Sequence, residues 1–154
     1  MIRKFAAIAI AAGVVLGTAG CNMISHVATN DPYAPSDGAQ GHIGDLKARN
    51  FLLLQDSTKS ILIGSLVNSA EAATKASLEY KDAGADKTTE VNLNGYQKFD
   101  LGYNGTAALP VVTDLKPGAL FKLTLRSNGE AVEISVPVLD GTLKEYKAIL
   151  DATN

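Results

Sequence analysis

Polar and apolar residues alternate strictly in the segment 75–80, which reads KASLEY. A period of two places successive side chains on opposite faces of an extended chain, so this pattern predicts a strand with one face in a core. Similar alternation occurs in 46–54, 120–126 and 132–138, and no helical stretch interrupts these segments. We therefore expect a protein built from β-sheets.

The segment 61–67, with the sequence ILIGSLV, has apolar residues on both faces. Ile61, Ile63 and Val67 would line one face of a strand, and Leu62 and Leu66 would line the other. A strand of this kind is covered on both sides, so we expect it at the centre of the fold.

Turn sequences separate the expected strands. Asn94-Gly95 is typical of a tight type I′ turn and predicts a hairpin between 91–93 and 99–101. Further along the chain, 115–118 predicts a turn, and 127–129 predicts a second hairpin leading into 132–138. Pro137 has no N–H, so we expect the last strand to lie at an edge or to pair on one side only at that point.

About seven short strands separated by turns predict an antiparallel β-sandwich of immunoglobulin-like type over residues 45–139. Residues 140–154 form either a tail across the sandwich or a short helix. Thr142-x-x-Glu145 would be a capping box for that helix, with Leu143, Tyr146, Ile149 and Leu150 on one face.

Residues 1–20 have the features of a secretory signal peptide. Arg3 and Lys4 precede an uncharged apolar run, which ends in small residues. The apolar run is shorter than the roughly 20 residues that span a bilayer, which favours a cleaved signal over the alternative of a single-pass anchor.

The residues Thr18, Ala19, Gly20 and Cys21 resemble the lipobox of bacterial lipoproteins. Cys21 is the only cysteine, which excludes an internal disulfide, and it lies at the end of the signal peptide. We expect Cys21 to carry the lipid that anchors the protein to the extracytoplasmic face of the cell membrane.

Residues 21–44 contain Pro32, Pro35 and three glycines without apolar periodicity, and they predict a flexible stalk. Alternatively, the end of the stalk nearer the domain packs along a sheet edge. Removal of residues 1–20 leaves 12 basic and 16 acidic side chains. This balance argues against a nucleic-acid binder, which would normally have a basic face.

Several short motifs resemble known families. The lipobox and five segments of the mature chain are similar to the LpqE-like lipoproteins of actinobacteria: Asp31-Pro32-Tyr33, Ser36-Asp37-Gly38, Gly44-Asp45-Leu46, Arg49-Asn50 and Leu66-Val67-Asn68. Leu115-x-Pro117-Gly118 and Leu123-x-Leu125 resemble the periplasmic copper chaperones of the PCuAC type. The resemblance implies an immunoglobulin-like or cupredoxin-like sandwich outside the cytoplasmic membrane.

The PCuAC-type chaperones hold Cu(I) with His and Met side chains, because soft thioether ligands select that ion. In this chain the only such residues are Met1, Met23, His26 and His42. Nothing beyond Gly44 offers an imidazole or a thioether, so we expect no metal site in the domain and no cofactor. The alternative is that Met23, His26 and His42 meet in the stalk.

Catalytic patterns are also missing from the sequence. The domain has no His to act as a base, and no Ser-x-x-Lys motif lies on an expected helix. Glu79, Glu90 and Glu133 alternate with core residues and should lie on solvated sheet faces. We therefore expect that the protein is not an enzyme.

These observations favour a monomeric, noncatalytic, membrane-anchored module that binds another envelope protein through a sheet face or an edge strand. Tyr96 and Tyr103 are the candidate interface residues, because tyrosine is enriched at interfaces. The alternative function is metal trafficking, by analogy with the copper chaperones.

Overall fold

The computed structural model describes residues 35–153. The expected signal peptide, the lipobox with Cys21, and the stalk up to residue 34 lie outside these residues. The described part contains nine strands and one helix: β1 (Ala39–Ile43), β2 (Leu46–Gln55), β3 (Ser60–Asn68), β4 (Thr74–Asp82), β5 (Ala85–Leu93), β6 (Lys98–Leu101), β7 (Leu109–Pro110), β8 (Leu120–Ser127), β9 (Glu130–Asp140) and α3 (Lys144–Ala152).

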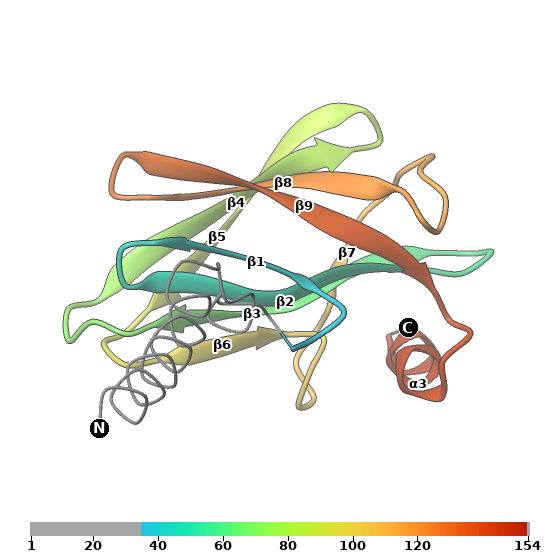
Figure 1. The fold of residues 1–154 in the computed structure, drawn as a ribbon, viewed down its shortest axis with the longest axis horizontal. Coiled ribbons are helices and arrows are strands. Elements are labelled where there is room, and N and C mark those ends of the chain that lie inside the picture. Colours follow the sequence, from blue (N-terminus) through green and yellow to red (C-terminus); the bar gives the residue numbers. More distant parts are fainter. Residues whose placement is uncertain (1–34, 154) are drawn as a thin grey trace, which may run out of the picture. The chain divides into compact units, whose positions relative to one another are not determined.

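The strands form a curled β-sandwich of the cupredoxin-like kind, as predicted. Their order is β5-β4-β8-β9-β2-β3-β6, with β1 added to β2 and β7 added to β3. Strand β9 joins the two layers, because it pairs antiparallel with β8 and parallel with β2 (Figure 1). The sheet is therefore mixed rather than wholly antiparallel, and the short β1 and β7 extend it beyond the seven expected strands.

Strand β9 lies in the middle of the strand order, so the expectation of an edge strand was wrong. At Pro137 itself, however, β9 pairs on one side only. Pro137 lies opposite Leu120 of β8, and pairing with β2 begins one residue later, at Val138. The missing N–H of Pro137 thus falls where no partner strand requires it.

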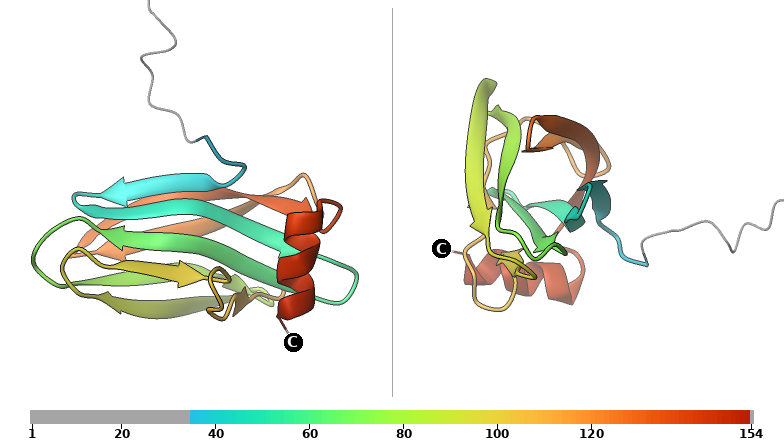
Figure 2. Two further views of the ribbon diagram at one scale, coloured as in Figure 1. Left: turned by 90° about the horizontal axis from the view of Figure 1, so that it is seen from below. Right: turned by 90° about the vertical axis from the view of Figure 1, so that its left-hand side faces the viewer.

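The expected covering of β3 on both faces is confirmed, although β3 is next to last in the strand order. Leu62 and Leu66 belong to the main core between the layers, whereas Ile61 and Ile63 belong to a second apolar cluster on the opposite face. Helix α3 covers that opposite face, and Leu150 is its buried residue (Figure 2). Within residues 35–153, no helix is long and apolar enough to cross a bilayer.

The C-terminal segment is a helix, but it begins differently from the prediction. Its N-cap is Leu143, and no side chain caps it. The N–H of Thr142 instead bonds to Asp140 Oδ1 at 3.1 Å, so Thr142 closes a turn after β9 and does not form a capping box. Tyr146 and Ile149 pack in the second cluster as expected, whereas Leu143 is exposed.

The predicted hairpin at residues 94–95 does not form. Strand β5 pairs with β4 and strand β6 pairs with β3, so the connection between them passes from one layer to the other. The positive φ angle of this connection falls on Tyr96, whose N–H bonds to Ala70 O at 2.9 Å. At Gly95 a Cβ atom would lie 1.8 Å from Glu71 O, so the backbones approach too closely there for a side chain.

Two hairpins form through turns in which both residues have positive φ angles. Asn128 and Gly129 have φ angles of 50° and 84° and join β8 to β9, which confirms the second predicted hairpin. Ala83 and Gly84, with φ angles of 51° and 81°, join β4 to β5. The sequence analysis did not predict this second turn.

The end of the expected stalk is ordered. Residues 39–43 form β1, which pairs with β2, so the alternative of packing along a sheet edge is what the structure shows. The N–H of Gly38 donates to Asn50 Oδ1 at 3.0 Å. The flexible stalk therefore does not extend to residue 44, because its last residues complete the sheet.

Candidate functional site

The three glutamates expected on solvated sheet faces are all found in exposed ion pairs. Glu79 pairs with Arg126 at 2.8 Å, Glu90 with Lys75 at 2.6 Å, and Glu133 with Lys122 at 3.2 Å. The hydrogen bond from Arg126 lowers the pKa of the Glu79 carboxyl. Each carboxylate has its own cation, and this arrangement is typical of a solvated surface.

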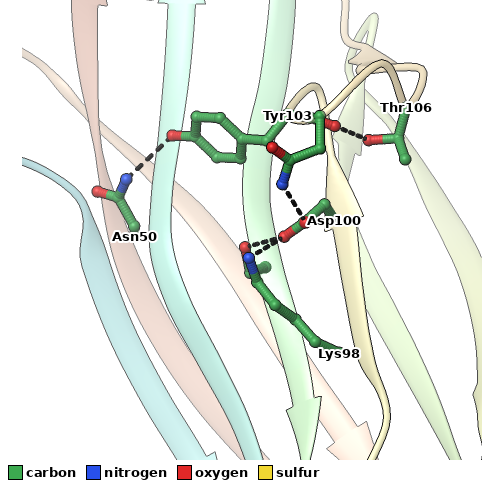
Figure 3. A network of polar contacts seen from close by, with 7 residues as sticks. Asn50, Lys98, Asp100, Tyr103 and Thr106 are labelled. Atoms are coloured by element: carbon green, nitrogen blue, oxygen red, sulfur yellow. Dashed lines mark hydrogen bonds and ion pairs between the residues drawn. The ribbon is translucent and has the colours of Figure 1, made fainter.

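The two tyrosines proposed for an interface lie apart, at opposite ends of β6. Tyr96 precedes the strand and is 73% exposed. Tyr103 follows it and is half-buried, and its hydroxyl accepts a hydrogen bond from Asn50 Nδ2 at 3.0 Å (Figure 3). The structure therefore does not bring the two rings into one surface patch.

A polar network surrounds Asp100 next to Tyr103 (Figure 3). Ser65 Oγ and Asn104 Nδ2 donate to its carboxylate at 2.5 and 2.7 Å, and Lys98 Nζ lies 2.9 Å away. Burial opposes the charge of Asp100, but these three donors still keep the pKa of the carboxyl below its usual value. Burial and Asp100 together raise the pKa of the Tyr103 hydroxyl.

All members of this network have partners within the chain. The bond from Asn104 to Asp100 fastens the loop after β6 to β6 itself, and Ser65 joins Asp100 to β3. The bond between Asn50 and Tyr103 fastens the same loop to the irregular point of β2, where Asn50 has a φ angle of 51°. The network therefore holds a loop in place.

His42 lies exposed on β1. Among residues 35–153 no group of three or more His, Cys, Asp or Glu side chains could hold a metal ion. Met23 and His26, the other members of the alternative stalk site, lie outside the described residues.

A groove of about 790 Å³ lies where β4 and β8 separate. The ladder between these strands ends at the pair Tyr80 and Leu123. Strand β4 nevertheless continues to Asp82 and turns into β5, while β8 begins earlier, at Leu120. Figure 1 shows the β4–β5 hairpin rising away from the beginning of β8.

The groove is apolar in its floor and on its walls. Phe121 is buried at the floor, where the centroid of its ring lies 6.2 Å from the centroid of the Tyr80 ring. Val112 and Leu120 line the walls although they are 65% and 61% exposed. Lys81 and Lys122 also line the groove. Pockets of this size with apolar walls and a few polar groups are typical of ligand sites.

Hydrogen bonds to Asp82 and its neighbour fix one wall. The N–H of Val112 donates to Asp82 Oδ1 at 2.7 Å, and the N–H of Ala83 donates to Val112 O at 2.8 Å. Lys87 holds the other carboxylate oxygen at 2.7 Å. These bonds join the segment after β7 to the β4–β5 turn, so the exposed side chain of Val112 has a defined position.

We expect acid to release this wall. The hydrogen bond from Lys87, followed by that from the Val112 N–H, lowers the pKa of the Asp82 carboxyl below its ordinary 3.8. Because the pKa of Asp82 is lower in the folded protein, its bond to Val112 stabilises the wall above pH 3.8. This stabilisation is lost as the pH falls through the pKa that Asp82 has in the folded protein. The Val112 amide resonance should therefore shift, and the protection of this amide relative to its intrinsic exchange rate should fall, only below pH 3.8.

The same measurement on two variants tests the cause. In Asp82→Ala, the Val112 amide should show at neutral pH the resonance position and the low protection that the wild type shows only in acid. Asp86→Ala, which removes the exposed partner of Lys81, should leave that signal unchanged. A Val112 signal that is unaffected by Asp82→Ala would contradict this account.

Sequence reasoning did not find the groove, although one signal was present. Leu120 lies on the same face of its strand as Lys122, Thr124 and Arg126, opposite the inward-facing Phe121. An apolar residue on a polar face is a mark of an exposed contact surface. Val112 gave no signal, because its exposure depends on the path of an irregular segment.

Comparison with known proteins identifies the fold. No family model and no curated protein matches the chain. The solved apo PmoF2 PCuAC domain superposes with a TM-score of 0.50 and 18% identity, over 69% of this chain and 97% of that domain. The copper-bound PCuAC domain from PmoF2 gives a TM-score of 0.49 and 17% identity, over 66% and 97% of the two chains. The chain shares the fold of the apo PmoF2 PCuAC domain.

Proposed function

We propose that this protein is a lipid-anchored, noncatalytic binding module of the cell envelope, and that its partner occupies the groove between the β4–β5 turn and β8. The observation that carries the proposal is the pair Val112 and Leu120. Two large apolar side chains stand exposed in one hollow whose wall is fixed by hydrogen bonds. Folding alone gives no reason to hold apolar side chains in water.

The location belongs to the same proposal. The resemblance of residues 18–21 to a lipobox supports attachment through Cys21 to the outer face of the cell membrane. The motifs similar to the LpqE-like lipoproteins of actinobacteria support the same location. In the sequence, 17 residues lie between Cys21 and the first strand at Ala39, and we propose that they link the domain to the membrane surface.

Copper trafficking is the second candidate, because the fold is that of the apo PmoF2 PCuAC domain. Its weakness is the ligand set. From Asp45 to the end, the sequence contains no His, Met or Cys. A Cu(I) site would need soft ligands that the domain does not supply.

The test is photo-crosslinking in living cells with the lipidated full chain. A photoreactive residue placed at Val112 or Leu120 should capture one recurrent species, whereas the same residue at Leu143 should give background only. Leu143 is the matched control, because it is a 53% exposed apolar residue outside the groove.

Two results would contradict the proposal. One is background capture at both groove positions. The other is stoichiometric Cu(I) binding by the purified full chain together with background capture, which would replace the binding module with copper trafficking.

A further inference from the structure

The backbone of Leu120 faces the groove. Leu120 lies opposite Pro137, and the adjacent bond runs from Val138 N to Ala119 O at 3.0 Å. This pattern marks Leu120 and Pro137 as a non-hydrogen-bonded pair, in which the N–H and C=O of each residue point away from the partner strand. The other side of β8 is open at this position, because no strand within residues 35–153 pairs with Leu120 there.

We propose that the occupant of the groove is an extended peptide segment that adds to the open edge of β8 at Leu120. Added strands are a common mode of peptide recognition, in which the main chain supplies hydrogen bonds and alternate side chains enter pockets. The separation of β4 from β8 provides the space, and the Leu120 N–H and C=O provide the bonding partners. This inference rests on the proposed function, since it names the partner of the same groove.

The side chains around this edge select the peptide. Val112 and Leu120 offer apolar contacts to alternate residues of an added strand. Of the charged residues that line the groove, Lys81 and Lys122 are basic and Asp114 is acidic. The ion pairs of the two lysines, with Asp86 at 2.7 Å and Glu133 at 3.2 Å, are exposed and therefore weak. An acidic residue of the peptide would replace these weak partners of Lys81 and Lys122, so the groove favours a peptide that carries one.

A lipid is the competing occupant of an apolar groove. An acyl chain would contact Val112 and Leu120 but could not bond to the backbone of Leu120. An acyl chain that covered the N–H and C=O of Leu120 would leave both groups without partners, which costs roughly 1–3 kcal/mol for each group. A peptide strand satisfies both groups, so the geometry favours the peptide.

The test separates backbone from side-chain contributions. Short random peptides displayed on phage are selected against the full chain, and the affinity of the selected peptides is measured for wild type, Leu120→Ala, Leu120→Pro and Leu143→Ala. Leu120 is the first residue of β8 and its N–H lies outside the β8–β9 ladder, so proline is compatible with the fold there. Unfolding curves check this for each variant.

We expect acidic, alternately apolar peptides whose affinity is unchanged by Leu143→Ala. Leu120→Pro should weaken binding about tenfold more than Leu120→Ala, since it also removes the N–H. Peptides N-methylated at single positions supply a readout that needs no variant. Methylation should abolish binding at one position only, that of the residue whose N–H bonds to the Leu120 C=O.

Equal losses for Leu120→Pro and Leu120→Ala, N-methylation without effect, or a selection that yields no peptide dependent on Leu120 would each overturn the inference. Binding of a fluorescent fatty acid that depends on Leu120, or Leu120-dependent binding to phosphatidylglycerol vesicles, would identify a lipid occupant. The groove would then still be the binding site of the proposed function, but its occupant would be a lipid and not a peptide. Background crosslinking at Val112 and Leu120 would overturn both.

Discussion

Replacing Phe51 by alanine should lower the free energy of unfolding by about 3–5 kcal/mol, the usual cost of removing a buried aromatic ring. Phe51 is fully buried in the main core, on the strand that joins β3 to β9. Its ring lies over Gly64 of β3, where a Cβ atom would come within 2.7 Å of the ring carbons. The two residues therefore fill one space between adjacent strands.

This shared space gives the prediction a second part. Gly64→Ala alone should destabilise the protein by roughly 1–3 kcal/mol, because the added methyl group overpacks the core. In the Phe51→Ala background the ring is gone, so the same methyl group should cost much less and the two effects should not add.

Urea unfolding of the four forms of the full chain measures the coupling. Phe99→Ala is the control, because Phe99 lies partly buried at the margin of the same core and should cost less. Additive losses for Phe51 and Gly64, or a smaller loss for Phe51→Ala than for Phe99→Ala, would contradict the described packing.

Replacing Cys21 by serine should move the protein from the membrane to the soluble fraction almost completely. Each buried CH₂ group of a lipid contributes roughly 0.8 kcal/mol, and two or more acyl chains make the attachment stable, whereas serine cannot form the thioether.

The measurement is fractionation of cells that express the full chain, together with incorporation of labelled palmitate. Ser25→Ala is the control, because it changes a nearby polar residue outside the lipobox; it should stay in the membrane and keep its label. If Cys21→Ser remained in the membrane without label, residues 1–20 would act as a permanent anchor, and the lipoprotein proposal would be wrong.

The sequence was most informative where local chemistry and burial agree. Strand β3 is apolar on both faces because α3 covers the face that the core does not, and Asn128-Gly129 forms the hairpin that its dipeptide predicts. At residues 94–95 a similar dipeptide misled the prediction. A turn sequence permits a reversal of the chain but does not determine which strands pair, and here the chain crosses between layers.

Strand β5 begins with ADKTT, which has no apolar alternation, and only its end was predicted. It is the last strand in the order, so its first half packs against little and its residues can be polar. The groove was missed for a related reason. The groove exists because β4 and β8 separate. The apolar periodicity of a strand predicts which residues face the core, but it does not predict where pairing with the next strand ends.

Strand β9, which joins the two layers, is synthesised after all the other strands. Its final residues pair with β2, so Leu53 meets Val138 only after nearly the whole chain has been synthesised. Contacts between residues so far apart in sequence make folding slow. A chain whose two layers join last would remain unfolded during the export that we propose, and it would close only after it had crossed the membrane.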